Sequence, residues 1–196
     1  MLPLKKAREA ECYTYEDYLT WDQTERYELI DGEPFMMGAP SREHQEILGE
    51  LFGQLRDYLK EKTCRVYLSP FSVRLFERDG DHPRRVNTVV EPDLSVICDP
   101  KKLDKMGCKG APDLIIEILS PSTQSHDRVK KFNLYRLAGV REYWLVDPDS
   151  RSVQVFVLEE GAYAAKSFST AGEKVQVSVL EDCEIDLAAV FPPVSE

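Results

Sequence analysis

Two carboxylates on neighbouring predicted strands could together form a metal site. Glu117 lies within the apolar run DLIIEIL, and Asp93 follows Pro92 and opens the strand LSVIC. Such an apolar strand is normally buried on both faces, so a bare carboxylate in it is costly unless it is paired, protonated or bound to a metal. Side by side, the two groups would offer the hard oxygen ligands that Mg²⁺ or Mn²⁺ prefers. The structural alternatives are a Glu117 that faces solvent at a strand end and an Asp93 that serves an ordinary turn.

Lys131 is predicted to lie on the apolar face of a helix. Helical spacing places it on the same face as Asp127 and Tyr135. A lysine in this position either extends its ammonium group to solvent or has a buried partner. Asp127, one turn earlier, is one candidate partner, and the Asp93–Glu117 pair with its metal is the other.

Two more polar residues could face the same pocket. His44 lies one turn into a predicted helix, where a histidine more often caps or packs than binds a ligand. Glu28 precedes the turn Asp31-Gly32 and alternates with apolar residues. Since alternate residues of a strand share a face, Glu28 faces either a cleft or solvent.

The elements that would position these residues mix strands and helices. Hydrophobic periodicity, caps and turn residues define them. In chain order they are a helix at 15–22, two strands flanking the hairpin turn Asp31-Gly32, a helix from Ser41 to about Lys62, strands at 64–69, 71–77, 89–98 and 113–119, a helix over 125–138 that stops at Gly139, and strands at 141–148, 152–160, 162–169 and 174–179.

This order predicts an α/β fold with a mixed β-sheet flanked by helices, an N-terminal β-hairpin and C-terminal strands. The length of 196 residues fits one domain over 1–196, with residues 1–12 loosely packed. The chain has no GxGxxG, GxxxxGK[ST] or GxSxG motif and no kinase signature. The classes of protein that depend on those motifs therefore have no support.

The composition indicates where in the cell the protein is located and which kinds of partner it binds. No apolar run is long enough to span a membrane and the N-terminus lacks a signal-peptide core, so we expect a cytoplasmic protein without a membrane partner. Five widely spaced cysteines without a CxxC pair argue against a disulfide framework. The net charge is −10, but residues 101–141 carry nine basic and four acidic residues. That segment could bind a nucleic-acid backbone.

Six segments carry a family resemblance over about residues 13–190. They are ELIDGE (28–33), His44 near a helix start, EPDLSV (91–96), APDLIIEILSPST (111–123), DRVKKFNLY (127–135) and GVREYWLVDP (139–148). In this order and spacing they resemble the Uma family within the PD-(D/E)xK nuclease superfamily, whose bacterial members are described as restriction endonucleases.

The resemblance implies a restriction-endonuclease-like core with Asp93 and Glu117 as metal ligands. The superfamily places its lysine two residues after the glutamate, where this chain has Leu119. The resemblance implies that Lys131 takes over that role from the helix, so that Asp93, Glu117 and Lys131 are the catalytic residues. The residues expected in the pocket or the outer shell of the metal are Glu28, His44, Asp127 and Tyr135.

The expected function is that of an endonuclease that uses Mg²⁺ or Mn²⁺ to hydrolyse phosphodiester bonds, with DNA as the substrate. One alternative is an inactive nuclease fold that serves as a binding or assembly module, in which Lys131 pairs with Asp127 alone and side chains fill the pocket. Another is a metal-dependent hydrolase of a small phosphate ester. A homodimer, formed through an exposed strand edge near the C-terminus, would suit cleavage of both strands of a duplex.

Overall fold

The structure, a computed structural model, describes residues 12–22, 24–120 and 126–191, and the side chains of 83, 126 and 127 lie outside this description. The helices are α1 (Tyr15–Tyr18), α2 (Arg42–Tyr58), α3 (Phe132–Ala138) and α4 (Leu187–Val190), with 3-10 turns η1 (Pro83–Arg85) and η2 (Pro100–Lys102) and a π-helical turn η3 (His126–Lys131). The strands are β1 (Tyr27–Ile30), β2 (Glu33–Met36), β3 (Arg65–Leu68), β4 (Val73–Arg74), β5 (Leu94–Ile97), β6 (Leu103–Asp104), β7 (Gly107–Lys109), β8 (Leu114–Ile118), β9 (Glu142–Asp147), β10 (Ser152–Glu159), β11 (Ala162–Thr170), β12 (Lys174–Gln176) and β13 (Glu184–Asp186).

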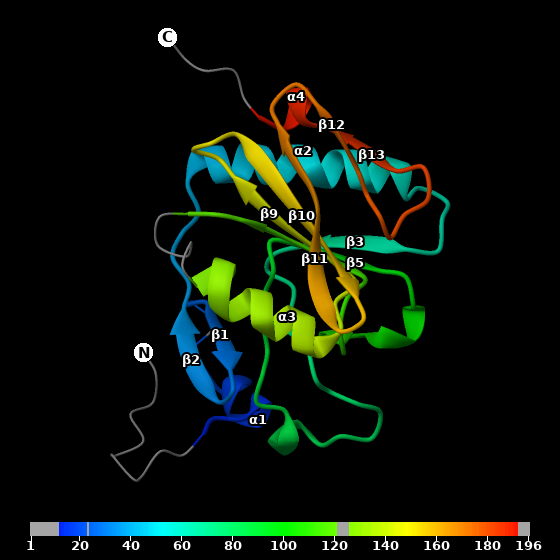
Figure 1. Ribbon diagram of the computed structural model, residues 1–196. Coiled ribbons are helices and arrows are strands. Elements are labelled where there is room, and N and C mark those ends of the chain that lie inside the picture. Colours follow the sequence, from blue (N-terminus) through cyan, green and yellow to red (C-terminus); the bar gives the residue numbers. More distant parts are fainter. Residues whose placement is uncertain (1–11, 23, 121–125, 192–196) are drawn as a thin grey trace.

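The central sheet is mixed, as predicted. Among the described residues, neighbouring strands of this sheet lie side by side in the order β11-β10-β9-β8-β5-β3. β8 and β9 are parallel, whereas the other neighbouring pairs are antiparallel. Helix α2 runs along one face of the sheet and α3 lies on the other (Figure 1). The predicted fold class is therefore confirmed.

Helix α2 forms one side of the core because its apolar residues repeat at helical spacing. The Ser41 side chain accepts a hydrogen bond from the His44 amide and caps the helix, as predicted. Ile47, Leu51 and Leu55 are completely buried against the sheet. Figure 1 shows the hairpin of β12 and β13 beside the same helix. The helix ends at Tyr58, one turn before the predicted end.

Helix α3 covers the opposite face and carries Lys131 at its start. The described helix begins with the π-helical turn η3, whose last residue is Lys131, and continues as an α-helix that ends at Gly139 in a left-handed conformation. Glycine adopts this conformation without the penalty of a Cβ. The sequence predicted a regular helix from residue 125. Single π turns widen a helix locally and are frequent at functional sites.

The N-terminal hairpin of β1 and β2 packs near α3 (Figure 1). Asp31 and Gly32 have φ angles of 51° and 80°. Both central residues of the two-residue turn thus have positive φ, which matches the twist of a hairpin. Ile30 joins the core that α3 covers, whereas Leu29 packs with Tyr15 and Trp21.

Some predicted strands are shorter in the structure. The strand predicted at 71–77 is reduced to β4, and of 89–98 only β5 is a regular strand. Val89 and Val90 instead form isolated bridges. The prediction that residues 1–12 are loosely packed falls on residues outside the described part, except for Cys12. Among the described helices, none combines the length and apolar character that a membrane crossing requires.

Candidate active site

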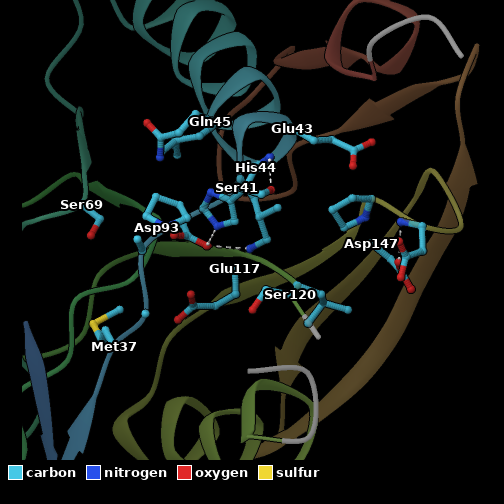
Figure 2. A pocket seen from close by; sticks show the side chains of 18 of the residues that line it. Met37, Ser41, Glu43, His44, Gln45, Ser69, Asp93, Glu117, Ser120 and Asp147 are labelled. Carbon is cyan, nitrogen blue, oxygen red and sulfur yellow. Dashed lines mark hydrogen bonds and ion pairs between the residues drawn. The ribbon is translucent and has the colours of Figure 1, made fainter. Parts of the chain in front are cut away.

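Asp93 and Glu117 lie together at one end of the central sheet. The antiparallel register pairs Leu94 with Ile116, which places Asp93 beside the end of β8. The Ile118 amide donates to Asp93 Oδ2 at 2.8 Å. Glu117 is only 4% exposed, so it does not face solvent at a strand end. Figure 2 shows the two side chains near each other at the centre of the pocket.

His44 reaches Asp93 from the first turn of α2. Its Nε2 lies 3.2 Å from Asp93 Oδ2. Because a carboxylate can only accept, His44 Nε2 carries the proton of this hydrogen bond. His44 Nδ1 is buried and has no hydrogen-bond partner in the described part of the chain. The histidine therefore fixes Asp93 from the helix side of the sheet, while the Ile118 amide fixes it from within the sheet.

Lys131 is buried between two glutamates from different elements. Its Nζ lies 3.0 Å from Glu117 Oε1 and 2.9 Å from Glu28 Oε1. The lysine side chain is 4% exposed, and those of Glu28 and Glu117 are 3% and 5% exposed. Glu28 comes from β1, so the ion pairs join the hairpin, the helix and the sheet. A charge this deeply buried requires such partners.

Tyr135 also forms a hydrogen bond with Glu117. Its hydroxyl donates to Glu117 Oε1 at 2.6 Å. Burial, and then the nearby charges of Glu117 and Glu28, raise the pKa of Tyr135 well above its ordinary value. The phenol therefore stays a donor. Lys131 and Tyr135 are four residues apart on one helix face, so both meet the same carboxylate oxygen.

Four of these residues line a pocket of about 430 Å³, a size typical of ligand sites, whereas Glu28 and Tyr135 are not part of its lining. Its lining includes His44, Asp93, Glu117 and Lys131. In Figure 2, Ser69 and Met37 lie on one side of the two central carboxylates, and Glu43 and Asp147 lie on the other. The pocket is open and is not filled by side chains.

The structure thus brings together six of the seven site residues selected from the sequence. They are Glu28, His44, Asp93, Glu117, Lys131 and Tyr135. The side chain of Asp127 lies outside the described residues. Lys131 contacts Glu28 and Glu117, so it does not pair with Asp127 alone, as the inactive module would require. The contacts are those expected of an active nuclease.

Sequence reasoning missed the Arg26 side of the pocket. Arg26 lines the pocket and forms an ion pair of 2.9 Å with the buried Glu91. Its Nη2 also donates to Ser69. The available signal was the spacing of two between Arg26 and Glu28, which places both side chains on one side of an extended chain.

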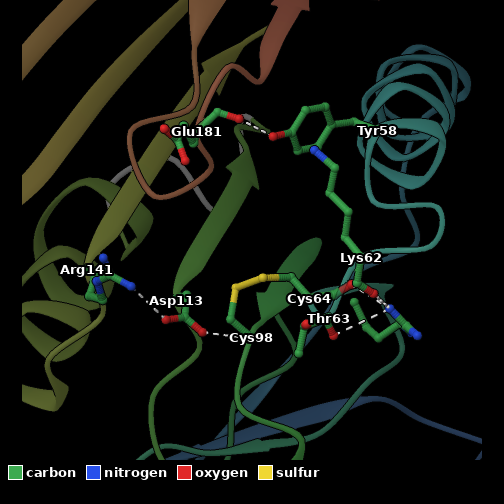
Figure 3. Close-up of a disulfide and its surroundings, with 9 residues drawn as sticks. Tyr58, Lys62, Thr63, Cys64, Cys98, Asp113, Arg141 and Glu181 are labelled. Carbon is green, nitrogen blue, oxygen red and sulfur yellow. Dashed lines mark hydrogen bonds and ion pairs between the residues drawn. A yellow bond between two sulfur atoms is a disulfide. The ribbon is translucent and has the colours of Figure 1, made fainter.

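A disulfide joins Cys64 and Cys98 at the end of β5 that is opposite to Asp93 (Figure 3). Cys64 precedes β3 and Cys98 follows β5, and the register pairs the adjacent residues Arg65 and Ile97. The expectation that the chain has no disulfide framework therefore missed one cross-strand pair. The spacing of the cysteines along the chain does not reveal that antiparallel register.

The basic segment 101–141 is divided between the two ends of the sheet. Lys131 lies in the pocket, and Arg128 pairs with Asp147 at its rim. Arg141 instead pairs with Asp113, which also accepts from the Cys98 amide at the disulfide end (Figure 3). The segment as a whole therefore does not form one surface beside Asp93.

The donor set at Asp93 and Glu117 fits a hard divalent cation. Within the described residues, the side-chain contacts of Asp93 all involve Oδ2, and Oδ1 has no hydrogen-bond or ion-pair partner. In that part of the chain no group of three or more His, Cys, Asp or Glu side chains forms a metal cluster. Mg²⁺ in nucleic-acid enzymes is commonly bound by one or two carboxylates, with water and substrate phosphate as its other ligands. Two carboxylates that line one open pocket match that pattern.

Comparison with known proteins identifies a family and a fold. The family model Uma2, described as "Putative restriction endonuclease", matches residues 15–188. The chain is 32% identical over 146 residues to "Uncharacterized protein slr1290" of Synechocystis sp. (strain ATCC 27184 / PCC 6803 / Kazusa), covering 72% of each chain. It is 27% identical over 139 residues to "Uncharacterized protein sll1609" of the same organism, covering 68% of this chain and 74% of that one.

A solved structure has the same fold. It is the crystal structure of a protein from Anabaena variabilis ATCC 29413 described as "a putative nuclease belonging to DUF820". The TM-score is 0.69 at 21% sequence identity, and the match covers 91% of this chain and 97% of that one.

Proposed function

The chain belongs to the Uma2 family of proteins described as restriction endonucleases, and on this basis we propose that it hydrolyses phosphodiester bonds in DNA at the Asp93–Glu117 pocket, with Mg²⁺ or Mn²⁺ as cofactor. The observation that carries the proposal is the convergence of Asp93, Glu117 and the buried Lys131 in one open pocket. Two carboxylates and a cation from three separate elements are costly to bury together, so their convergence favours a chemical role.

The metal would be held by Asp93 and Glu117. Asp93 presents Oδ1, while Oδ2 is fixed by the His44 ring and the Ile118 amide. Glu117 is oriented through Oε1 by Lys131 and Tyr135. When bound, a divalent ion supplies Lewis acidity toward a phosphate oxygen and toward the attacking water.

Lys131 would act through its charge. Its ammonium group is fixed by two carboxylates in a water-poor site, where a charge interacts more strongly than it does in water. A group held in this way needs no reorganisation when negative charge develops on the phosphate. Tyr135 would keep Glu117 in place during the reaction, because its hydroxyl remains protonated.

Metal binding tests the proposal without knowledge of the DNA sequence that is cut. We would titrate Mn²⁺ into the wild type, Asp93→Ala and Asp99→Ala by calorimetry. Asp93 and Asp99 flank β5 at its two ends, and Asp99 only caps the turn η2. We expect stoichiometric binding in the wild type and Asp99→Ala, and loss of binding in Asp93→Ala.

Cleavage would then be measured on supercoiled plasmid DNA, and on bis(p-nitrophenyl) phosphate as a small diester. We expect nicking that requires Mn²⁺ or Mg²⁺ and is lost in Asp93→Ala. Hydrolysis of the small ester without cleavage of the plasmid would indicate that the substrate is a small phosphate ester and not DNA. A wild type that binds no Mn²⁺, with or without a 20-base-pair duplex, would contradict the proposal and leave a binding module as the better description.

A further inference from the structure

Arg26 enters the pocket from the hairpin that also supplies Glu28. It directly precedes β1, and the two residues are separated by one position along an extended chain. Alternate side chains of a strand point to the same side. Glu28 contacts Lys131 inside the site, and Arg26 lines the same pocket.

The guanidinium group is held on one side by a buried carboxylate. Glu91 Oε2 accepts from Arg26 Nε at 3.1 Å and from Nη2 at 2.9 Å. Glu91 is 7% exposed, and its other oxygen accepts from the hydroxyl of Tyr18 at 3.3 Å. Nη2 also donates to Ser69, whose amide in turn donates to the Asp93 carbonyl. The orientation of Arg26 is therefore fixed close to the segment that carries Asp93.

The remaining nitrogen of Arg26 is left for a ligand. The hydrogen bonds and the ion pair of this side chain use Nε and Nη2, and within the described residues Nη1 has no partner. The side chain is 34% exposed although its charge is paired. A guanidinium group fixed by a carboxylate through two nitrogens can still bind a phosphate oxygen through the third.

The charges around the pocket favour an anion on the Arg26 side. Arg26 contacts Ser69 and Met37, which lie on one side of the two central carboxylates in Figure 2. Glu43 and Asp147 lie on the opposite side of the view, and Asp149 also lines the pocket. A phosphate is repelled from the acidic side and attracted to the arginine side.

We propose that Arg26 Nη1 binds a non-reacting phosphate of a nucleic-acid strand, so that the strand enters the pocket past Ser69 and Met37. This inference rests on the proposed function, because the reacting phosphate is assigned to Asp93 and Glu117. Arg26 forms no ion pair with either of those carboxylates, since its ion-pair partner in the described residues is Glu91. It is a positioning residue that acts on binding of the strand, and Glu91 orients it.

Binding of fluorescein-labelled dT20 by anisotropy tests this in EDTA, over a series of NaCl concentrations. Arg26→Met removes the charge but leaves the buried Glu91 without its partner, so Arg26→Met/Glu91→Gln is measured beside it. Arg26→Lys keeps the charge. The matched control is Arg141→Met, which also removes a carboxylate-paired arginine, but at the disulfide end of the sheet.

We expect both Arg26→Met variants to bind dT20 about tenfold more weakly at low salt, as for loss of one hydrogen bond between charged groups. The slope of log K against log salt should become less steep by about 0.7, the value for one phosphate contact on a single strand. Arg26→Lys should retain most of the slope, and Arg141→Met should match the wild type. Urea unfolding of each variant shows that it is folded.

Two results would overturn the inference. One is a wild type that does not bind dT20, and the other is an equal loss of affinity in Arg26→Met and Arg141→Met.

Calorimetry with Mn²⁺ separates this inference from the proposed function, because Arg26→Met should bind the metal as the wild type does. Binding of dT20 that depends on Arg26 in a protein that binds no Mn²⁺ would support the inference and refute the proposed hydrolysis. In an active enzyme, Arg26→Met should raise KM more than it lowers kcat.

Discussion

The Nζ of Lys131 lies 2.9 Å from Oε1 of Glu28, and this contact joins the start of α3 to the N-terminal hairpin. The same ammonium group contacts Glu117 in the central sheet. Three elements that are distant in the sequence are therefore held by one buried cation. The site and the packing of the hairpin are coupled, because removal of the Lys131 charge leaves two buried carboxylates without that cation.

Replacement of Lys131 by methionine should destabilise the fold. The substitution keeps the length of the apolar stem but leaves Glu28 and Glu117 buried without their cation. Loss of one partner of a buried ion pair typically costs about 3 kcal/mol or more. We expect Lys131→Met to lower the free energy of unfolding by about 3 kcal/mol in urea titrations at pH 7, by the same estimate.

The neighbouring Lys130 provides the control. It lies on the same turn, is 37% exposed and forms a 3.7 Å ion pair with Glu33. Lys130→Met should cost less than about 1 kcal/mol, as for exposed pairs. The double variant Lys131→Met/Glu28→Gln should recover part of the lost stability. Equal unfolding midpoints for Lys131→Met and the wild type would show that Lys131 does not hold the two glutamates together.

His44 should control the affinity for the metal without being one of the proposed ligands. Its ring hydrogen bond fixes Asp93 Oδ2, and loss of such a supporting contact to a ligand typically costs 10–100-fold in metal affinity. We expect a weakening of about this size for Mn²⁺ in His44→Leu by calorimetry. Gln45→Ala, one residue further along α2 and also at the pocket, should bind as the wild type does. An unchanged affinity in His44→Leu would assign the histidine to packing alone.

Two of the three central residues were predictable because each breaks a local pattern: Glu117 interrupts an apolar strand and Lys131 interrupts an apolar helix face. Asp93 was selected instead because it opens a strand expected to lie beside that of Glu117. Such conflicts between residue type and environment mark functional sites, since burial of a charge must be compensated. The position of Tyr135 follows from helical periodicity once Lys131 is placed inward.

The missed features all depend on contacts between distant segments. Arg26 looks like an ordinary polar residue before a hairpin, and only the fold brings Glu91 beside it. Cys64 and Cys98 flank predicted strands, but their pairing requires the register of β3 against β5. Hydrophobic pattern predicts which face of a strand is buried, whereas it leaves the choice of partner strand open.

Glu142 should make stability depend on pH. Burial raises the pKa of Glu142 above its ordinary value, although the Trp144 indole and the amides of Ser178 and Val179 donate to the carboxylate and oppose the shift. The folded state therefore holds this proton more tightly than the unfolded state does. The stability that Glu142 contributes is largest below pH 4.5, the ordinary pKa, and is lost as pH rises through the raised pKa.

Comparison with Glu142→Gln isolates this effect, because the glutamine does not titrate. We expect the free energy of unfolding of the wild type minus that of the variant to fall as pH rises above 4.5, measured by urea titration followed by circular dichroism. A difference that grows with pH would mean that the three donors outweigh the cost of burial.

Reduction of the disulfide should lower stability and leave the pocket unchanged. Cys64 and Cys98 are separated by 34 residues, and closure of a loop of that length contributes about 3–4 kcal/mol by its effect on the unfolded chain. The bond lies at the end of β5 that is opposite to Asp93. We therefore expect dithiothreitol to lower the urea midpoint but to leave Mn²⁺ binding as it is in the oxidised protein.

Titration of thiols establishes the redox state in the same samples. Cys12 is exposed, whereas burial raises the pKa of Cys108 to about 12 and that of Cys183 to about 11. Only Cys12 should react rapidly with a thiol reagent in the native protein at pH 8, because the thiolate is the reactive form. Denaturation without a reductant should expose the other two thiols, and reduction should add Cys64 and Cys98.

The Cys64→Ser/Cys98→Ser variant provides the control for the effect of the disulfide on stability, and it should unfold like the reduced wild type. A variant as stable as the oxidised protein would show that the bond does not stabilise the fold.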